Sequence, residues 1–190
     1  MVIRAGEVLE SRARRQAPRE IDHHPLNGSA GKRRHGGRDF FQNPPKPAWA
    51  HLCIDNNSIV QCVLDDHIAG GAPGANEDGI QLELAGYAKQ TEAEWLDEYG
   101  LQLLDNAANA AAQFCLKFDI AVRRLTNEEL VDLKSKGFVS HAQVSEVFKR
   151  SDHWDPGPGF PWTFFLNKVE QHRAARLAKT ISAATSPLPS

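Results

Sequence analysis

The sequence is poor in several features, and each shortage narrows the kind of protein it encodes. No apolar run in the 190 residues is long enough to cross a bilayer, so we expect no stable membrane insertion. Residues 1–20 lack the apolar run and small-residue cleavage site of a secretory signal, which predicts a cytoplasmic location in the producing cell. The net charge of only -2 favours neither a nucleic acid nor an acidic membrane as partner.

Cysteine is also scarce. Cys53, Cys62 and Cys115 form no C-x-x-C pair, and their count is odd. Each lies in an apolar stretch, so we expect three buried free thiols and not thiolate ligands of a metal. A reducing compartment suits such thiols.

The remaining composition is that of an ordinary globular protein, with 41% hydrophobic and 24% charged residues and no internal repeats. The length fits one domain. Residues 1–20 carry five arginines and little apolar periodicity, which predicts a basic leader that is peripheral or mobile. We expect the domain itself over residues 21–181 and a flexible tail over residues 182–190, where the composition is that of a loop.

The middle of the chain has the alternation typical of β-strands. Residues 50–55 and 59–64 are separated by a short polar turn, which predicts a hairpin. Within residues 79–86, apolar side chains alternate with Gln81 and Glu83. A strand over this segment places these two polar side chains together on the face opposite the apolar ones.

Helices are predicted in the second half of the chain. Two capping boxes indicate helix starts, Thr91 with Glu94 and Thr126 with Glu129. The first predicts one long helix whose apolar stripe continues to Phe118. The second predicts a shorter helix that Gly137 ends, and a last helix begins near Trp162. Strands that precede and alternate with helices favour an α/β sheet flanked by helices.

Eight histidines are many for this length, and several stand in loop-like segments. A catalytic zinc needs three protein ligands and an open position, lowers the pKa of its water to about 7 and polarises a carbonyl. A carboxylate nearby can take a proton from that water and pass it to a leaving nitrogen. The chain has residues of each type but no H-E-x-x-H motif, so spacing alone defines no site.

Five segments, taken in order, resemble the type 2 N-acetylmuramoyl-L-alanine amidases, whose superfamily includes the peptidoglycan recognition proteins. They are IDHHPLNG at 21–28, FFQNP at 40–44, AHLCID at 50–55, NEDGIQLELAG at 76–86, and the stretch from KGFVSHAQVS to DHWDPGPGFPW at 136–162. The similarity is greatest to amidase domains of endolysins from phages that infect mycobacteria and related actinobacteria.

This resemblance implies a single α/β domain with a mixed central β-sheet flanked by helices. It implies a zinc-dependent hydrolase that cleaves the amide between N-acetylmuramic acid and L-alanine of peptidoglycan. The expected partner is peptidoglycan (muropeptide) as substrate, with no nucleic acid, and the protein is expected to be a monomer. A phage or prophage lysin of this kind waits in the host cytoplasm and acts on the cell wall after release.

The resemblance also implies a ligand set for Zn2+. By position in the family motifs, the metal ligands are His24, His141 and Asp155. His24 is preferred because the family has a glycine four residues after its first ligand, and Gly28 stands there. His23 remains the alternative first ligand.

Two further roles follow from the same resemblance. The family's strand carboxylate falls on Glu83, the expected general base, and its oxyanion-stabilising residue falls on His153. In an extended segment that ends at proline, His153 and Asp155 can point the same way. Ser140 stands where the family usually has glycine before its histidine ligand.

Alternative hypotheses remain open. Glu83 is also compatible with an ordinary surface position on a strand. A peptidoglycan-binding module that keeps the groove but has lost turnover fits the same motifs. A nucleic-acid-binding protein is a further alternative, and it would use Arg4, Arg12, Arg14, Arg15 and the basic cluster at 32–38.

Overall fold

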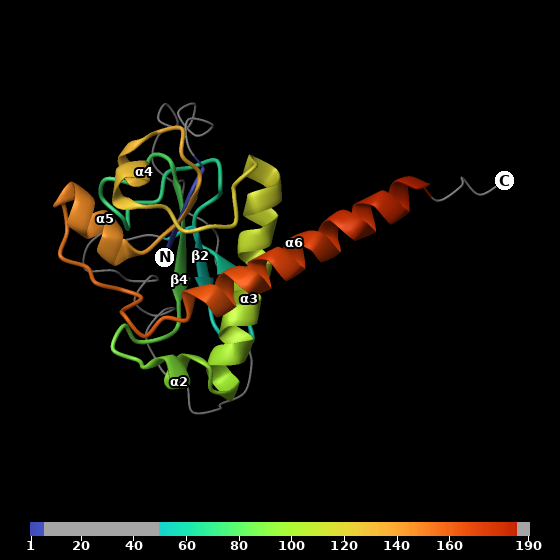
Figure 1. The fold of residues 1–190 in the computed structure, drawn as a ribbon, viewed down its shortest axis with the longest axis horizontal. Coiled ribbons are helices and arrows are strands. Elements are labelled where there is room, and N and C mark those ends of the chain that lie inside the picture. The colour runs from blue at the N-terminus through green and yellow to red at the C-terminus, as the bar shows by residue number, and fades with distance from the viewer. Residues whose placement is uncertain (6–49, 186–190) are drawn as a thin grey trace.

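Five short strands form the sheet at the centre of the part of the chain that the computed structural model describes, residues 1–5 and 50–185 (Figure 1). They are β1 (Val2–Arg4), β2 (Leu52–Ile54), β3 (Ile59–Gln61), β4 (Gly79–Leu84) and β5 (Gly137–Val139), in the order β3-β2-β4-β1-β5. β2 and β4 are parallel, and the other neighbours are antiparallel. The predicted α/β class with a mixed sheet is confirmed.

Helices cover both faces of this sheet. The larger core lies between one face and the helices α2 (Glu92–Trp95), α3 (Glu98–Phe118) and α6 (Trp162–Thr185). A smaller apolar cluster on the other face involves α4 (Asn127–Val131) and α5 (His141–Phe148). None of the helices in the described residues combines the length and hydrophobicity needed to span a membrane.

The alternation of β4 decides which side chains enter the core. The apolar residues of β4 pack into the larger core, and Glu83 projects from the opposite face, as predicted. Gln81 shares that face but is buried. Its side-chain amide forms hydrogen bonds with the loop that precedes the strand: it donates to the carbonyl of Ala69 and accepts from the backbone N–H of Gly71. The predicted hairpin is also confirmed, with β2 and β3 paired from Leu52 to Ile54.

The prediction of a peripheral N-terminal leader is wrong for residues 1–5. β1 is the strand between β4 and β5, and Ile3 is fully buried in the larger core. Side chains of alternate residues enter opposite cores, Ile3 in the larger cluster and Val2 in the smaller. A strand buried on both faces carries no polar alternation, so this short apolar segment lacked the signal by which a strand is predicted. The remaining part of the predicted leader lies outside the described residues.

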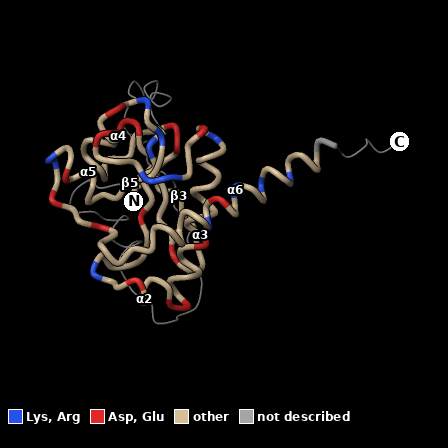
Figure 2. The backbone as a smooth tube through the Cα atoms, viewed as in Figure 1, with Lys and Arg blue, Asp and Glu red and all other residues tan. Residues whose placement is uncertain are grey.

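Arg4 is charged yet almost completely buried, with an exposed fraction of 1%. Its guanidinium donates to the Asp78 carboxylate and to the carbonyl of Leu130, which joins β1 to the loop before β4 and to α4. Arg4 is therefore unavailable to the nucleic acid of the alternative hypothesis, whose other arginines lie outside the described residues. Acidic and basic residues are interspersed along the described chain (Figure 2).

Two helix boundaries differ from the prediction. The expected long helix is interrupted, because Asp97 accepts a hydrogen bond from the backbone N–H of Gly100 and starts α3 anew after α2. Both predicted capping boxes are present. The helix that follows the second box ends at Val131, and Gly137 instead opens β5.

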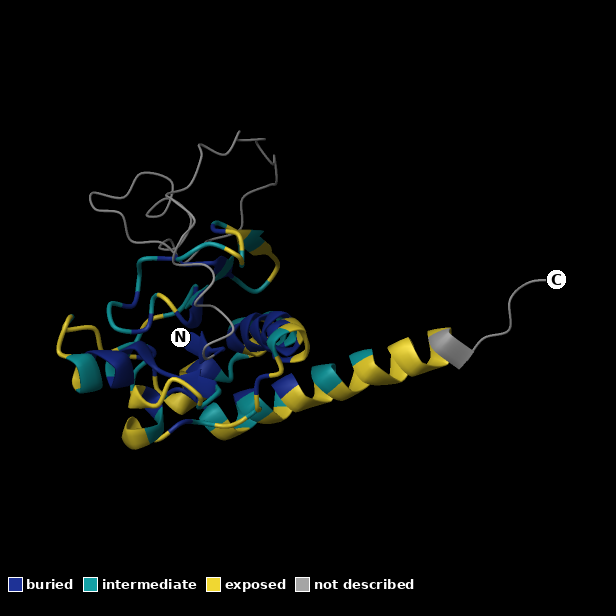
Figure 3. Cartoon of the chain, turned by 90° about the horizontal axis from the view of Figure 1, so that it is seen from above, coloured by how far each residue is buried: buried dark blue, intermediate teal, exposed yellow. Residues whose placement is uncertain are grey.

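The last helix and two of the cysteines also differ from the prediction. α6 continues to Thr185, beyond the predicted start of a flexible tail at 182, and its C-terminal half extends from the body with mostly exposed residues (Figure 3). Cys115 is buried as expected, but Cys53 and Cys62 are only half-buried. They lie on and beside the hairpin that β2 forms with the edge strand β3.

We predict that Arg4→Ala lowers the free energy of unfolding by about 3–5 kcal/mol, because the Asp78 carboxylate is left buried without its partner. Urea unfolding measures the change. Arg123→Ala is the matched control, since Arg123 pairs with Glu129 at the surface and its loss should cost less than about 1 kcal/mol. Equal, small losses in both variants would contradict the interior position of β1 in the sheet.

Candidate metal centre

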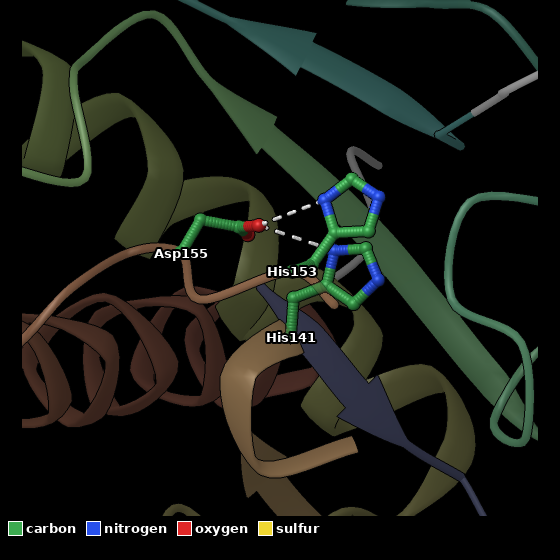
Figure 4. A group of neighbouring side chains, drawn as sticks. All are labelled: His141, His153 and Asp155. Atoms are coloured by element: carbon green, nitrogen blue, oxygen red, sulfur yellow. Dashed lines mark ion pairs between the residues drawn. The ribbon is translucent and has the colours of Figure 1, made fainter. Parts of the chain in front are cut away.

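Three side chains with metal-binding chemistry meet at one end of the sheet: His141, His153 and Asp155 (Figure 4). One candidate ligand atom from each lies within 4.8 Å of the other two. The Nδ1 atoms of His141 and His153 lie 3.2 Å and 3.5 Å from Oδ1 of Asp155. The two imidazoles are stacked, with centroids 4.1 Å apart and planes 11° from parallel.

His141 is positioned by the junction between β5 and α5. It is the first residue of α5, directly after Ser140, whose hydroxyl accepts a hydrogen bond of 3.0 Å from the backbone N–H of Gln143. This N-cap fixes where the helix begins and therefore where the imidazole projects. Ser140 thus has a structural role at the position where the resemblance implies glycine.

Asp155 lies in a loop that is held at both ends. The backbone N–H of Ala142, in the first turn of α5, donates to the carbonyl of Asp155 at 3.0 Å. Beyond the cis Asp155–Pro156 bond, Gly157 has φ +87° and its α-carbon faces the carbonyl of Ala88, where a β-carbon would not fit. The loop is therefore packed against the segment that follows β4.

An aromatic cluster anchors the far end of the same loop. The ring of Phe160 lies 5.1 Å from that of Trp95, 4.9 Å from that of Trp162 and 5.6 Å from that of Phe165, all in edge-to-face arrangements. Such contacts each stabilise by about 0.5–1.5 kcal/mol beyond the burial of area. The segment from Asp155 to Trp162 is thus fixed to α2 and α6 on one side and to α5 on the other.

Glu83 faces this cluster from β4. Burial raises the pKa of Glu83, the negative charge of Asp155 raises it further, and the positive charges of the Met1 amino group and His153 oppose the rise. The Met1 amino group lies 3.9 Å from Oδ2 of Asp155 and donates to the carbonyl of Leu82. No local sequence pattern indicates this contact, because it depends on the pairing of β1 with β4 and β5.

Asp155 has the opposite electrostatic character. Burial tends to raise its pKa, but the hydrogen bond from His141 and the positive charges of Met1, His141 and His153 outweigh burial and lower the pKa to about 2. Two carboxyl groups at one site therefore differ in proton affinity. Such a difference is typical of sites that need one permanent anion and one group able to exchange a proton.

The donor set fits a zinc ion. Two imidazoles and a carboxylate are ligands that zinc prefers, and the ionised state of Asp155 suits coordination. Nε2 of His141 is buried and has no hydrogen-bond partner among the residues that the structure describes. This nitrogen points away from Asp155, whereas Nδ1 of both imidazoles faces the Asp155 carboxylate, so Nδ1 is the atom that a shared ion would bind (Figure 4).

Among the predicted site residues, His141, His153 and Asp155 come together, and Glu83 faces them. His24 and its alternative His23 lie outside the described residues. His51 is fully buried, and both ring nitrogens have backbone partners: Nδ1 accepts from Gln81 at 3.0 Å and Nε2 lies 3.0 Å from the carbonyl of His67. His51 therefore links β2 to β4 and to the loop after β3.

The chain is similar to known proteins in sequence and in fold. Residues 14–158 match the model of a family described as N-acetylmuramoyl-L-alanine amidase. The fold is similar to the crystal structure of the Staphylococcus aureus hydrolase AmiA in complex with its ligand, with a TM-score of 0.53 and 18% sequence identity. The similarity covers 74% of this chain and 64% of that one, so it spans less than two thirds of the AmiA chain. No curated protein matches the sequence significantly.

The geometry therefore defines an α/β domain that carries a His-His-Asp cluster at one end of its sheet. Since the family model matches most of its length, the chain belongs to the N-acetylmuramoyl-L-alanine amidase family.

We predict that carboxyl NMR titration of the metal-free protein gives Asp155 a midpoint near 2 and Glu83 a midpoint above 4.5. Because the folded pKa of Asp155 is below its unfolded value of about 3.9, its ionised form stabilises the fold above that pH. This stabilisation is lost as the pH falls toward 2. Equal midpoints for the two groups would contradict the described electrostatics.

Proposed function

We propose that the protein is a zinc-dependent N-acetylmuramoyl-L-alanine amidase that hydrolyses the amide between N-acetylmuramic acid and the first L-alanine of peptidoglycan. The observation that carries the proposal is the convergence of His141, His153 and Asp155 within 4.8 Å, in a chain of this family. Zinc, when bound, would polarise the amide carbonyl and make water acidic enough to attack at neutral pH.

Two of the side chains are assigned to the metal. His141 offers Nδ1, which lies 3.2 Å from Oδ1 of Asp155, and Asp155 offers a carboxylate that stays ionised well below neutral pH. The third ligand has two candidates. His24 is implied by the family resemblance. His153 is favoured because its Nδ1 lies only 3.5 Å from Oδ1 of Asp155.

The other polar groups would carry the proton transfers. Glu83 faces the cluster with a pKa that burial raises, so its carboxylate is a stronger base than an exposed one and is suited to take a proton from water and deliver it to the leaving nitrogen. His153 has an exposed fraction of 56%, and in its protonated form it would donate to the oxyanion of the tetrahedral intermediate.

The setting that we propose is a lysin of a phage or prophage, which reaches the cell wall after release from the cytoplasm. This setting rests on the resemblance of the motifs to those of actinobacteriophage endolysins. A peptidoglycan-binding module without turnover is the second candidate, and the side-chain cluster is compatible with it.

The proposal predicts that wild-type protein purified with zinc carries the metal and releases new L-alanine amino termini from purified peptidoglycan. His141→Ala should lose both properties. Mass spectrometry for zinc and an amino-terminus assay measure them, with His172→Ala on α6 as the control histidine that leaves both unchanged. A metal-free and inactive wild type would overturn the proposal, and metal without turnover would favour the binding module.

Paired variants distinguish the two candidates for the third ligand. If His24 is the ligand, His24→Ala loses zinc, while His153→Ala keeps zinc and lowers kcat by about 10²- to 10³-fold through the lost oxyanion contact. If His153 is the ligand, His153→Ala is the variant that loses zinc. Zinc affinity from competition with a chelator gives the answer, and full affinity in both variants would contradict both assignments.

A further inference from the structure

Cys53 and Cys62 form a pair of thiols on the edge hairpin. Their sulfur atoms are 3.4 Å apart and share a hydrogen bond. The pairing of β2 with β3 explains this proximity. Cys53 lies opposite Val60, and Cys62 follows Val60 by two residues, so its side chain is on the same face of the hairpin as those of Val60 and Cys53. Diagonal neighbours on one face of an antiparallel pair can reach each other when the strand twist brings them close.

The pair projects from the face of the sheet that carries Glu83. The neighbours of Cys53 on β2, Leu52 and Ile54, are buried in the larger core, so the Cys53 thiol points to the opposite face. In the parallel pairing of β2 with β4, Cys53 lies directly beside Glu83. Both cysteines are partly accessible to solvent, whereas Cys115 is buried.

The two sulfurs differ in reactivity. The hydrogen bond with Cys53 lowers the pKa of the Cys62 thiol to about 7, in spite of partial burial. The same hydrogen bond, burial and the negative charges of Cys62 and Glu83 raise the pKa of Cys53. Burial raises the pKa of Cys115 to about 12. Cys62 is therefore the thiol that ionises more readily, and the Cys53 sulfur lies within reach as its partner.

We propose that Cys53 and Cys62 are an oxidation site, a dithiol that a peroxide converts to a disulfide next to Glu83. The proposal does not depend on the amidase activity. The bond would link β2 to the chain after β3 and fasten the edge hairpin of the sheet. A sulfur–sulfur bond of about 2.05 Å requires the sulfurs to approach by little more than an ångström from their present distance.

The reaction is balanced with one peroxide molecule as oxidant. The Cys62 thiolate attacks one peroxide oxygen, the O–O bond breaks, and hydroxide leaves as water after taking a proton, which gives a sulfenic acid on Cys62. The Cys53 sulfur then attacks the Cys62 sulfur and loses its proton, and the sulfenic oxygen leaves as a second water. Two electrons pass from the two thiols to the peroxide.

The test treats the folded, metal-free protein with hydrogen peroxide at pH 7 and follows each thiol by alkylation and peptide mass spectrometry. We expect a linked Cys53–Cys62 peptide, a mass lower by about 2 Da, and a rate at least about 100-fold above that of Cys115, the internal control. The melting temperature should rise by about 5 °C on oxidation and return on reduction.

Single serine variants identify the attacking sulfur. Cys53→Ser keeps a hydrogen-bond donor beside Cys62, so a dimedone adduct of sulfenic acid should accumulate on Cys62. Cys62→Ser should give no adduct on Cys53. Oxidation of Cys115 at the same rate as the pair, or three thiols that remain free under peroxide in the wild type, would overturn the proposal.

Discussion

The negative charge of Asp155 is the interaction on which the site depends. The carboxylate is partly withdrawn from water, and burial alone would favour its protonated form. The hydrogen bond from His141, followed by the electrostatic influence of the Met1 amino group and of the two histidines, outweighs burial and lowers the pKa of Asp155 to about 2. The same negative charge raises the proton affinity of Glu83 nearby. One anion thus raises the proton affinity of the neighbouring carboxyl group, and in the proposed function the same anion binds the metal.

This arrangement requires a rigid support, since a displacement of about 1 Å can abolish a coordination site. The support comes from three places in the fold. The cap at Ser140 fixes the start of α5, the close approach of Gly157 to Ala88 fixes the turn after Asp155, and the rings around Phe160 hold the loop to α2 and α6. These contacts join segments that are far apart in the sequence.

Local patterns were sufficient to predict much of this fold. The alternation in β4 placed Glu83 on the correct face, and two capping boxes marked the starts of α2 and α4. The spacing of His153 and Asp155 in an extended segment placed both side chains on one side. Each of these features depends on residues a few positions apart, so a single sequence contains the information.

Features that depend on distant partners were not predictable in the same way. β1 has no periodicity of its own, and its interior position in the sheet results from pairing with β4 and β5 and from the Arg4–Asp78 ion pair. The shifted pKa values of Glu83 and Asp155 arise from burial and from charges on other segments. The half-exposed thiols of Cys53 and Cys62 likewise reflect the edge position of their hairpin, which an apolar pattern does not reveal.

The most direct measurement of the central claim is anomalous diffraction at the zinc edge from crystals grown with stoichiometric zinc. The account predicts a strong peak within about 2.0–2.2 Å of a nitrogen of His141 and an oxygen of Asp155. A peak elsewhere in the molecule, with these two side chains bonded only to each other, would contradict it.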